Sequence, residues 1–290
     1  MDLKDIQRHI DQVMNEQNNS SVQEFEGYSA FEMHHILNLT FETNSPISFQ
    51  KLTDSDYAKI PMHNQIKYFL DLIKKTGEIK LTAKGFLPTK IVKDIYVQGY
   101  LEEPLFTSGT HQLYKESDSM TVNLTRLLVE LSGLTKKRNG KLSLTKKGEE
   151  ISSDSFKLFN LIFKTITTKF NWAFYDGYGD NQIGQLGFGF SLILLHMYGE
   201  TKRHDTFYAE KYFNAFPDLV DSEPLSDFDT PIERARSCYS LRTFDRFLDY
   251  FGLIQIETAR EKWKTDKYIT KTDIFDKLIK VRPHNMRYGS

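Results

Sequence analysis

The stretch from Thr121 to Gly148 combines helix, turn and strand signals in an order that few folds accommodate. Gly133 is suited to the left-handed conformation that ends a helix, and Asn139-Gly140 favours a type I′ hairpin turn. Thr145 can cap a following helix. The helix before Gly133 is predicted from apolar residues at i, i+3, i+4 and i+7, namely Leu124, Leu127, Leu128 and Leu131. Helix, glycine, basic hairpin and new helix together indicate the closing part of a winged helix-turn-helix.

Similar signals recur twice elsewhere in the chain, which favours an internal repeat. Residues 81–85 (Leu-Thr-Ala-Lys-Gly) match residues 144–148 (Leu-Thr-Lys-Lys-Gly), and Tyr268-Ile269-Thr270 closes a third copy that lacks the last glycine. Apolar stripes precede the helix-ending Gly77 and Gly252; they are Ile66, Phe69, Leu70 and Ile73 in the first copy and Phe244, Phe247, Leu248 and Phe251 in the third. Three matches in one order favour three degenerate winged-helix units.

The spacing within each copy predicts the size of its wing. Leu81 lies four positions after Gly77, which is too short for two strands and a turn, so the first unit should have almost no wing. Leu144 lies 11 positions after Gly133, which allows a short hairpin. Ile269 lies 17 positions after Gly252, which allows a long one.

We therefore expect a mainly α fold with small β-hairpins, in which tandem winged-helix-like units pack around a buried connecting helix. The predicted segments are an N-terminal helix and linker (1–22), a first winged-helix-like unit with a reduced wing (23–98), a second winged-helix-like unit (99–153), a connecting helix with an aromatic turn (154–182) and a third winged-helix-like unit with a long wing (183–290).

Composition narrows the class of protein. A formal net charge of −1 over 290 residues gives no overall field that would attract nucleic acid or an anionic membrane. The single cysteine, Cys238, excludes an internal disulfide and fits a reducing compartment. No apolar run approaches the roughly 20 residues that span a bilayer, and the first residues are too charged for a secretory signal. We expect a cytoplasmic protein that has no membrane partner and uses no cofactor.

Several segments occur in an order that resembles a family of uncharacterised bacterial proteins, some of them associated with SEC-C-motif or plasmid ORF-3-like proteins. These segments are residues 26–37, 80–88, 144–148, 171–178 and 251–253, so the resemblance covers most of residues 25 to 280. The Leu-Thr-x-x-Gly segments are common to many winged helices, whereas Asn171-Trp172-Ala173 is more particular. The resemblance implies a bacterial origin and a shared architecture, and it implies no reaction and no catalytic residue.

The second wing carries the strongest local charge signal, because residues 135–147 include six bases and no acid. A basic hairpin tip suits contacts to nucleic-acid phosphates beside a helix in the major groove. The alternative is a hairpin tip that is basic only for solubility. The expected recognition helices also carry acids that phosphates would avoid, including Asp71, Glu130, Asp245 and Asp249. The candidate nucleic-acid contacts in this wing are Lys136, Lys137, Arg138, Lys141, Lys146 and Lys147.

The third wing places bases around Trp263, and aromatic residues between bases can stack on single strands. The alternative, which we favour, is that Trp263 packs under its own hairpin. The candidate contacts in this wing are Arg260, Lys262, Lys264 and Lys267.

The turn at residues 171–180 is rich in aromatic residues and glycine, and it permits either close packing of two units or a small-ligand pocket. The pocket residues would be Asn171, Trp172, Phe174, Asp176 and Tyr178. His34 and His35 point about 100° apart on a helix, so they cannot share one metal ion, and we expect no metal site. No nucleophile elbow or phosphate-binding glycine loop occurs.

Three functions remain open from the sequence. The first is a non-enzymatic DNA- or RNA-binding module, regulatory in role, that uses the second and third wings. The second is a protein-interaction scaffold of winged helices that have lost nucleic-acid contact, with a protein partner bound through the N-terminal helix. The third is an enzyme with an unrecognised site near Trp172, which is the least favoured, so the chain is expected not to be an enzyme.

Overall fold

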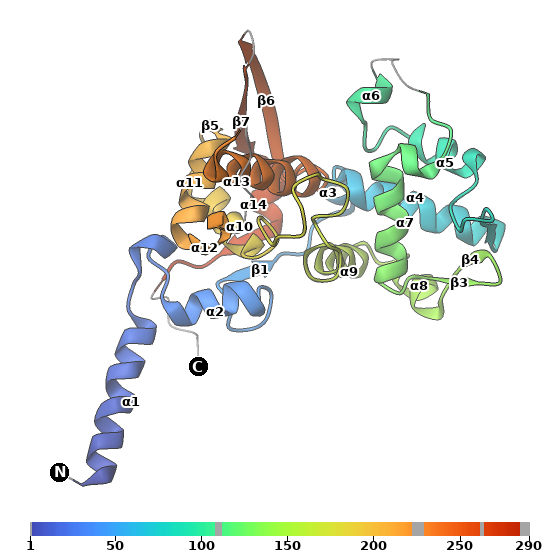
Figure 1. The fold of residues 1–290 in the computed structure, drawn as a ribbon. Helices are drawn as coiled ribbons and strands as arrows, with labels where there is room; N and C mark the ends of the chain where they lie inside the picture. The colour runs from blue at the N-terminus through green and yellow to red at the C-terminus, as the bar shows by residue number, and fades with distance from the viewer. Residues whose placement is uncertain (1, 108–111, 222–228, 262–263, 285–290) are drawn as a thin grey trace. The chain divides into compact units, whose positions relative to one another are not determined.

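The computed structural model describes residues 2–107, 112–221, 229–261 and 264–284. The described chain is mainly helical with small antiparallel sheets, which confirms the predicted fold class at that level. Contacts group the chain into two compact units, each of which is described by itself (Figure 1). Unit 1 comprises Met1–Gln50, Trp172–Asp249 and Leu253–Ser290, and unit 2 comprises Lys51–Asn171 and Tyr250–Gly252. The segments predicted from the sequence end instead at residues 22, 98, 153 and 182.

Unit 2 consists of helices around one small sheet. Its elements in chain order are α3 (Asp54–Tyr57), α4 (Pro61–Thr76), β2 (Ile79–Lys80), α5 (Thr89–Tyr96), α6 (Pro104–Thr107), η2 (Glu116–Asp118), α7 (Met120–Leu131), β3 (Thr135–Arg138), β4 (Lys141–Leu144), α8 (Lys146–Ile151) and α9 (Ser155–Thr168).

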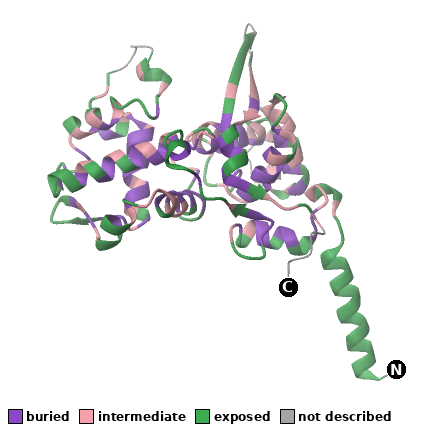
Figure 2. Ribbon diagram, turned by 180° about the vertical axis from the view of Figure 1, so that it is seen from behind, coloured by how far each residue is buried: buried purple, intermediate pink, exposed green. Residues whose placement is uncertain are grey.

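The core of unit 2 is built by α4, α7 and α9. The predicted stripe of α4 is fully buried, from Ile66 to Ile73. Phe159 and Phe163 of α9 pack on Phe251, with ring centroids 5.8 and 5.0 Å apart. The stripe predicted for α7 is only partly correct, because Leu131 is 41% exposed whereas polar residues on other sides of the helix are buried. Burial on nearly every side therefore distinguishes α7 from a surface helix (Figure 2).

The sheet of unit 2 has the strand order β2-β4-β3 and is antiparallel. Asn139 and Gly140 connect β3 to β4 with φ of 50° and 70°, so the predicted type I′ turn is confirmed. Gly133, with φ of 73°, follows α7 as expected. Strand β2 comes from the predicted first unit and pairs with the hairpin of the predicted second unit, so residues of both build one sheet.

Unit 1 is also mainly helical. Its elements in chain order are α1 (Leu3–Asn19), η1 (Gln23–Phe25), α2 (Ala30–Asn38), β1 (Ile47–Phe49), α10 (Phe188–Tyr198), β5 (Arg203–His204), α11 (Asp205–Ala215), α12 (Asp218–Asp221), α13 (Pro231–Tyr239), the π-helix η3 (Ser240–Leu248), β6 (Ile254–Glu261), β7 (Lys264–Lys271), α14 (Asp273–Leu278) and β8 (Ile279–Val281). Strand β1 pairs with β8, and the other strands form a sheet of order β5-β7-β6.

The two units repeat one plan of helix, strand, helices and hairpin, with the first strand beside the last in each three-stranded sheet. Matching backbone hydrogen bonds support the equivalence. Leu134 N donates to Val129 O in unit 2, and Leu253 N donates to Leu248 O in unit 1, both at 3.0 Å. The long hairpin predicted for the third copy is confirmed as β6 and β7.

The third copy ends two residues later than the sequence predicts, at Thr272 instead of Thr270. Thr270 lies inside β7, and the residue that caps the next helix is Thr272. Thr145 N donates to Leu134 O and Thr272 N donates to Leu253 O, both at 3.0 Å, so Thr145 and Thr272 are the equivalent residues. Ile269-Thr270 has the same residue pattern as Leu144-Thr145, but it lies inside β7, which is longer than the equivalent strand β4.

The surroundings of Gly148 explain why the Leu-Thr-x-x-Gly segment ends in glycine. A Cβ at this position would overlap the carbonyl of Leu134, which is backbone and cannot move aside easily. We predict that Gly148→Ala lowers the free energy of unfolding of unit 2 by about 1–3 kcal/mol, although alanine is the better helix former. Urea unfolding would measure this change. Glu149→Ala, at an exposed neighbour, should change stability by less than about 0.5 kcal/mol, and equal effects of the two variants would contradict the account.

His63 makes the stability of unit 2 sensitive to acid. Burial lowers its pKa from the ordinary 6.5 to about 4, because the charged ring is poorly solvated beside Tyr57. The unfolded chain therefore binds a proton that the folded chain does not, and stability falls as the pH drops from 6.5 toward 4, by roughly 3 kcal/mol.

The measurement is urea unfolding at several pH values, with pulsed hydrogen exchange in α4 reporting unit 2. His63→Leu should flatten the pH dependence between 6.5 and 4, whereas His34→Leu, which changes an exposed histidine, should leave it unchanged. An unchanged slope in His63→Leu would refute the assignment.

Candidate nucleic-acid interface

The strand register of unit 2 places cations on one face of the sheet and the core on the other. Ile79, Leu142 and Leu144 are buried. Because side chains alternate along a strand, their neighbours in β2, β3 and β4 project to the opposite side. We call this exposed surface the basic face, and it consists of Lys80, Lys136, Arg138 and Lys141.

Three residues of the basic face form a row across the sheet. Lys80 pairs with Lys141 in the β2–β4 ladder, and Lys141 pairs with Arg138 in the β4–β3 ladder. Neighbouring strands lie about 4.8 Å apart, so like charges stand side by side in an arrangement that normally destabilises a sheet. Lys141 forms an ion pair with the exposed Glu78. Within the part of the chain that the structure describes, Lys80, Lys136 and Arg138 have no ion-pair partner.

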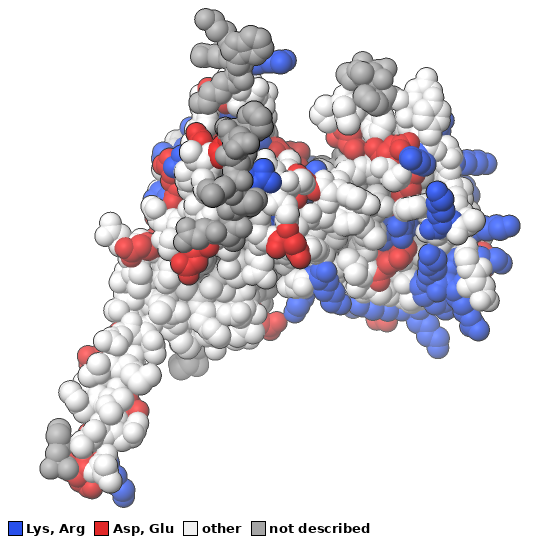
Figure 3. Space-filling view, viewed as in Figure 1, with Lys and Arg blue, Asp and Glu red and all other residues white. Residues whose placement is uncertain are grey.

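Further cations surround the basic face. Figure 3 shows Lys and Arg side chains gathered over the end of unit 2 that carries β3 and β4. Exposed lysines flank β2 on both sides, in the last turn of α4 and in the loop before α5; they are Lys74, Lys75 and Lys84. Sequence reasoning missed these residues and Lys80, because only the pairing of the two-residue strand β2 with β4 brings them to the hairpin.

The other predicted residues of this wing have different positions. Lys137 lies at the sheet edge with its ammonium group against Gly85. Lys146 is exposed in the first turn of α8. Lys147 Nζ donates to the carbonyl of Ser132 at 2.8 Å, so it caps the end of α7 and serves the fold.

The N-terminus of α7, where a recognition helix would approach DNA, is occupied by a carboxylate of unit 2 itself. Glu103 accepts hydrogen bonds from the backbone N–H groups of Met120 and Thr121 at 3.1 and 3.2 Å. The fully buried Glu116 accepts from Arg126 Nε at 2.5 Å on the flank of the same helix. These carboxylates satisfy donors that a phosphate or a base would need, so α7 is poorly suited to enter a groove.

Among its described residues, the β6–β7 hairpin of unit 1 does not present an equivalent basic surface. Lys267 Nζ contacts Asp245 at 2.5 Å and Ser240 Oγ at 3.0 Å, and burial raises the pKa of Asp245 while Lys267 opposes the rise. Arg260 is exposed. Lys262 lies outside the described residues, and for Lys264 only its place at the start of β7 is described.

The part of the aromatic turn that belongs to unit 1, residues 172–180, is arranged around the side chain of Arg242. This fully buried side chain forms an ion pair with Asp176 at 2.5 Å and donates to the carbonyl of Gly179 at 3.0 Å. Trp172 is buried against Phe247, with ring centroids 4.7 Å apart. Tyr178 lies beside Arg234, and the carbonyl of Phe174 accepts from Arg246, whereas Asn171 is the last residue of its stretch of unit 2. These contacts all lie within unit 1, where they engage the side chains of Trp172, Asp176 and Tyr178 that a ligand pocket would use.

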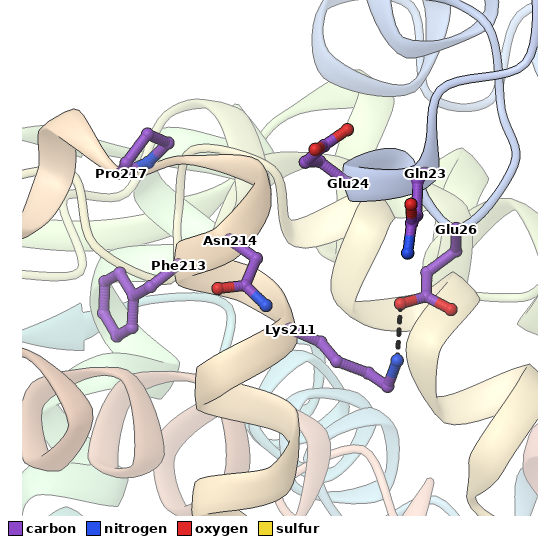
Figure 4. A pocket seen from close by; sticks show the side chains of 7 residues that line it. All are labelled: Gln23, Glu24, Glu26, Lys211, Phe213, Asn214 and Pro217. Carbon is purple, nitrogen blue, oxygen red and sulfur yellow. Dashed lines mark hydrogen bonds and ion pairs between the residues drawn. The ribbon is translucent and has the colours of Figure 1, made fainter.

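Two cavities are lined by other residues. One of about 560 Å³ lies in unit 1 between η1 and α11, and Figure 4 shows Lys211 reaching Glu26 within it, at 2.6 Å. Glu26 also accepts from the hydroxyl of Tyr198, so its charge is already balanced. The other cavity, of about 510 Å³, lies in unit 2; its lining includes Lys93, Tyr96, Val97 and Leu113.

The described residues also bear on metal binding and on membrane insertion. In residues 2–107, 112–221, 229–261 and 264–284, no group of three or more His, Cys, Asp or Glu side chains is arranged to hold a metal ion. No helix among the same residues has both the length and the apolar character needed to cross a membrane.

Part of the chain matches a known protein family. Residues 58–157 match the family model of the Y4jL N-terminal domain, a stretch that runs from just before α4 to the start of α9 and so includes the whole basic face. The name of that family states no activity. No curated protein and no solved structure matches the chain significantly. The expected association with SEC-C-motif or plasmid ORF-3-like proteins stays a prediction.

Repulsion within the row of Lys80, Lys141 and Arg138 should lower the stability of unit 2. Arg138→Thr removes one repulsion and should raise the free energy of unfolding of unit 2 by about 0.2–1 kcal/mol, whereas Glu78→Gln removes an attraction and should lower it by a similar amount. Both effects should shrink at high salt, because the charges are exposed. Urea unfolding at low and high salt would test this, and changes of the same sign for both variants would contradict the arrangement.

Proposed function

We propose that unit 2 binds the phosphate backbone of nucleic acid through the basic face, as the wing of a winged-helix module. The observation that carries the proposal is the row of Lys80, Lys141 and Arg138, whose mutual repulsion an anionic ligand would relieve. The order α4, β2, α5, α7, β3, β4 and the strand order β2-β4-β3 support the winged-helix assignment. The same plan in unit 1 supports a tandem arrangement.

The proposed contact is to backbone and carries little sequence preference. Base edges in the major groove are read by an inserted helix or ribbon, and α7 has its N-terminus satisfied by Glu103 and most of its surface buried. The basic face carries no aromatic side chain, whereas single-strand binding relies on aromatic stacking. A duplex, which presents phosphates without requiring stacking, is therefore the favoured ligand.

Unit 1 is a poorer candidate for phosphate contact, and the interaction scaffold that the sequence left open stays the alternative for it. His204, Tyr268 and Glu257 occupy the positions that Lys80, Lys141 and Arg138 occupy in unit 2. Lys202 pairs with Glu257 at 2.7 Å, and His204 Nε2 contacts Asp266 at 3.2 Å. A surface whose charges are balanced internally has little to offer phosphates, so we assign nucleic-acid contact to unit 2 alone.

The test is binding of duplex DNA, duplex RNA and single strands to the full chain across a salt titration. We expect salt-sensitive binding of duplexes, with a slope of log K against log salt of roughly 0.9 per phosphate contacted. Lys80→Ser/Lys136→Ser/Arg138→Ser should weaken binding and reduce the slope by roughly 2 to 3.

The matched control removes the same charge elsewhere in unit 2, by Lys51→Ser/Lys157→Ser/Lys169→Ser at three exposed lysines outside the sheet. This variant should retain most of the binding and the slope. Absence of binding at low salt, or equal losses in the two triple variants, would refute a role for the basic face.

A further inference from the structure

The N-terminal helix α1 has an apolar stripe that its own unit leaves uncovered. Leu3, Ile6, Ile10 and Val13 are 82%, 40%, 44% and 38% exposed, and no residue of α1 is buried. Figure 2 shows the helix exposed along its whole length. The stripe follows alternating steps of three and four residues, which is the a/d spacing of helices that pair with other helices.

The helix has few interactions of its own to hold it together. It is 17 residues long, and the side chain of Asp2 makes no capping hydrogen bond. Its side-chain pairs, such as Arg8 with Asp5 at 2.9 Å, are exposed and contribute little. Isolated helices of about this length are marginal in water unless an apolar face is packed against something. A covering partner is therefore expected.

The charges beside the stripe indicate what the partner is. Gln7, His9 and Met14 flank the centre of the stripe, and none of them is an acid, a lysine or an arginine, so two copies of α1 can approach there without repulsion between carboxylates or between ammonium groups. An anionic membrane surface would favour lysine and arginine on the polar face. The helix instead has more acids than bases: Asp5, Asp11 and Glu16 against Lys4 and Arg8.

We infer that α1 pairs with α1 of a second copy of this chain, through the stripe of Leu3, Ile6, Ile10 and Val13. The contact is self-complementary, as expected for an assembly of identical subunits. It is short, so association should be reversible and concentration-dependent. The inference does not rest on nucleic-acid binding.

The test is sedimentation of the full chain over a wide concentration range. The average mass of the wild type should rise with concentration, whereas Ile6→Glu/Ile10→Glu should sediment as a monomer throughout. Gln12→Glu/Asn15→Glu adds the same charge on the opposite side of the helix and should associate like the wild type. The melting temperature of the rest of the chain should be the same in both variants as in the wild type, because α1 contributes no buried residue.

Two results would overturn the inference. The first is a monomeric wild type at every concentration, whether or not α1 then binds vesicles or another protein. The second is association that survives Ile6→Glu/Ile10→Glu, which would place the contact elsewhere on the chain.

Discussion

The register of the β3–β4 hairpin is the constraint on which both the core and the surface of unit 2 depend. The type I′ turn at Asn139-Gly140 pairs Arg138 with Lys141, and that pairing sends Leu142 and Leu144 inward and the cations outward. A slip of one residue would exchange the two faces, exposing leucines and burying charges. The hydrophobic core therefore fixes the basic face, and the like-charged row persists because the core specifies the register.

The two units share one plan but differ in the side chains on the solvent face of the sheet. Both retain the backbone hydrogen bonds that fold the chain from the long helix into the hairpin, at Leu134 and Leu253. In unit 2 the first strand brings Lys80 to the hairpin, whereas in unit 1 the corresponding residue is His204, beside Asp266. Stability requires the shared hydrogen bonds, and the side chains on the solvent face were free to differ. We interpret the basic row as a feature kept for binding, since it opposes folding.

The sequence alone predicts the structural features that depend on residues close together in the chain. The stripe of α4, the stop at Gly133, the turn at Asn139-Gly140 and the cap at Thr145 each depend on a few neighbouring residues, and the structure confirms all four. The capping box of Ser29 and Glu32 likewise depends only on residues that are close in the chain.

What sequence reasoning missed depends on partners distant in the chain. Strand β2 has only two residues, too few for an alternation signal, and its pairing with β4 spans about 60 residues. The buried polar side chains Asn123 and Arg126 of α7 are paired with Glu116, a residue outside the helix that no periodicity marks. Lys267 is predicted from the sequence as a nucleic-acid contact, whereas the fold pairs it with Asp245, a residue distant in the chain. The candidate site at the second hairpin stays a prediction, and the residues that the sheet adds beside it, such as Lys80, depend on a pairing that the sequence does not reveal.

The most direct test of the central claim is lysine acetylation footprinting of the full chain, with and without a saturating short duplex. The account predicts protection of Lys80, Lys136 and Lys141, with Lys51 and Lys267 reacting equally in both states. Protection confined to other lysines, or none at Lys80 and Lys141 while the duplex is bound, would contradict the assignment of the basic face as the phosphate-binding surface.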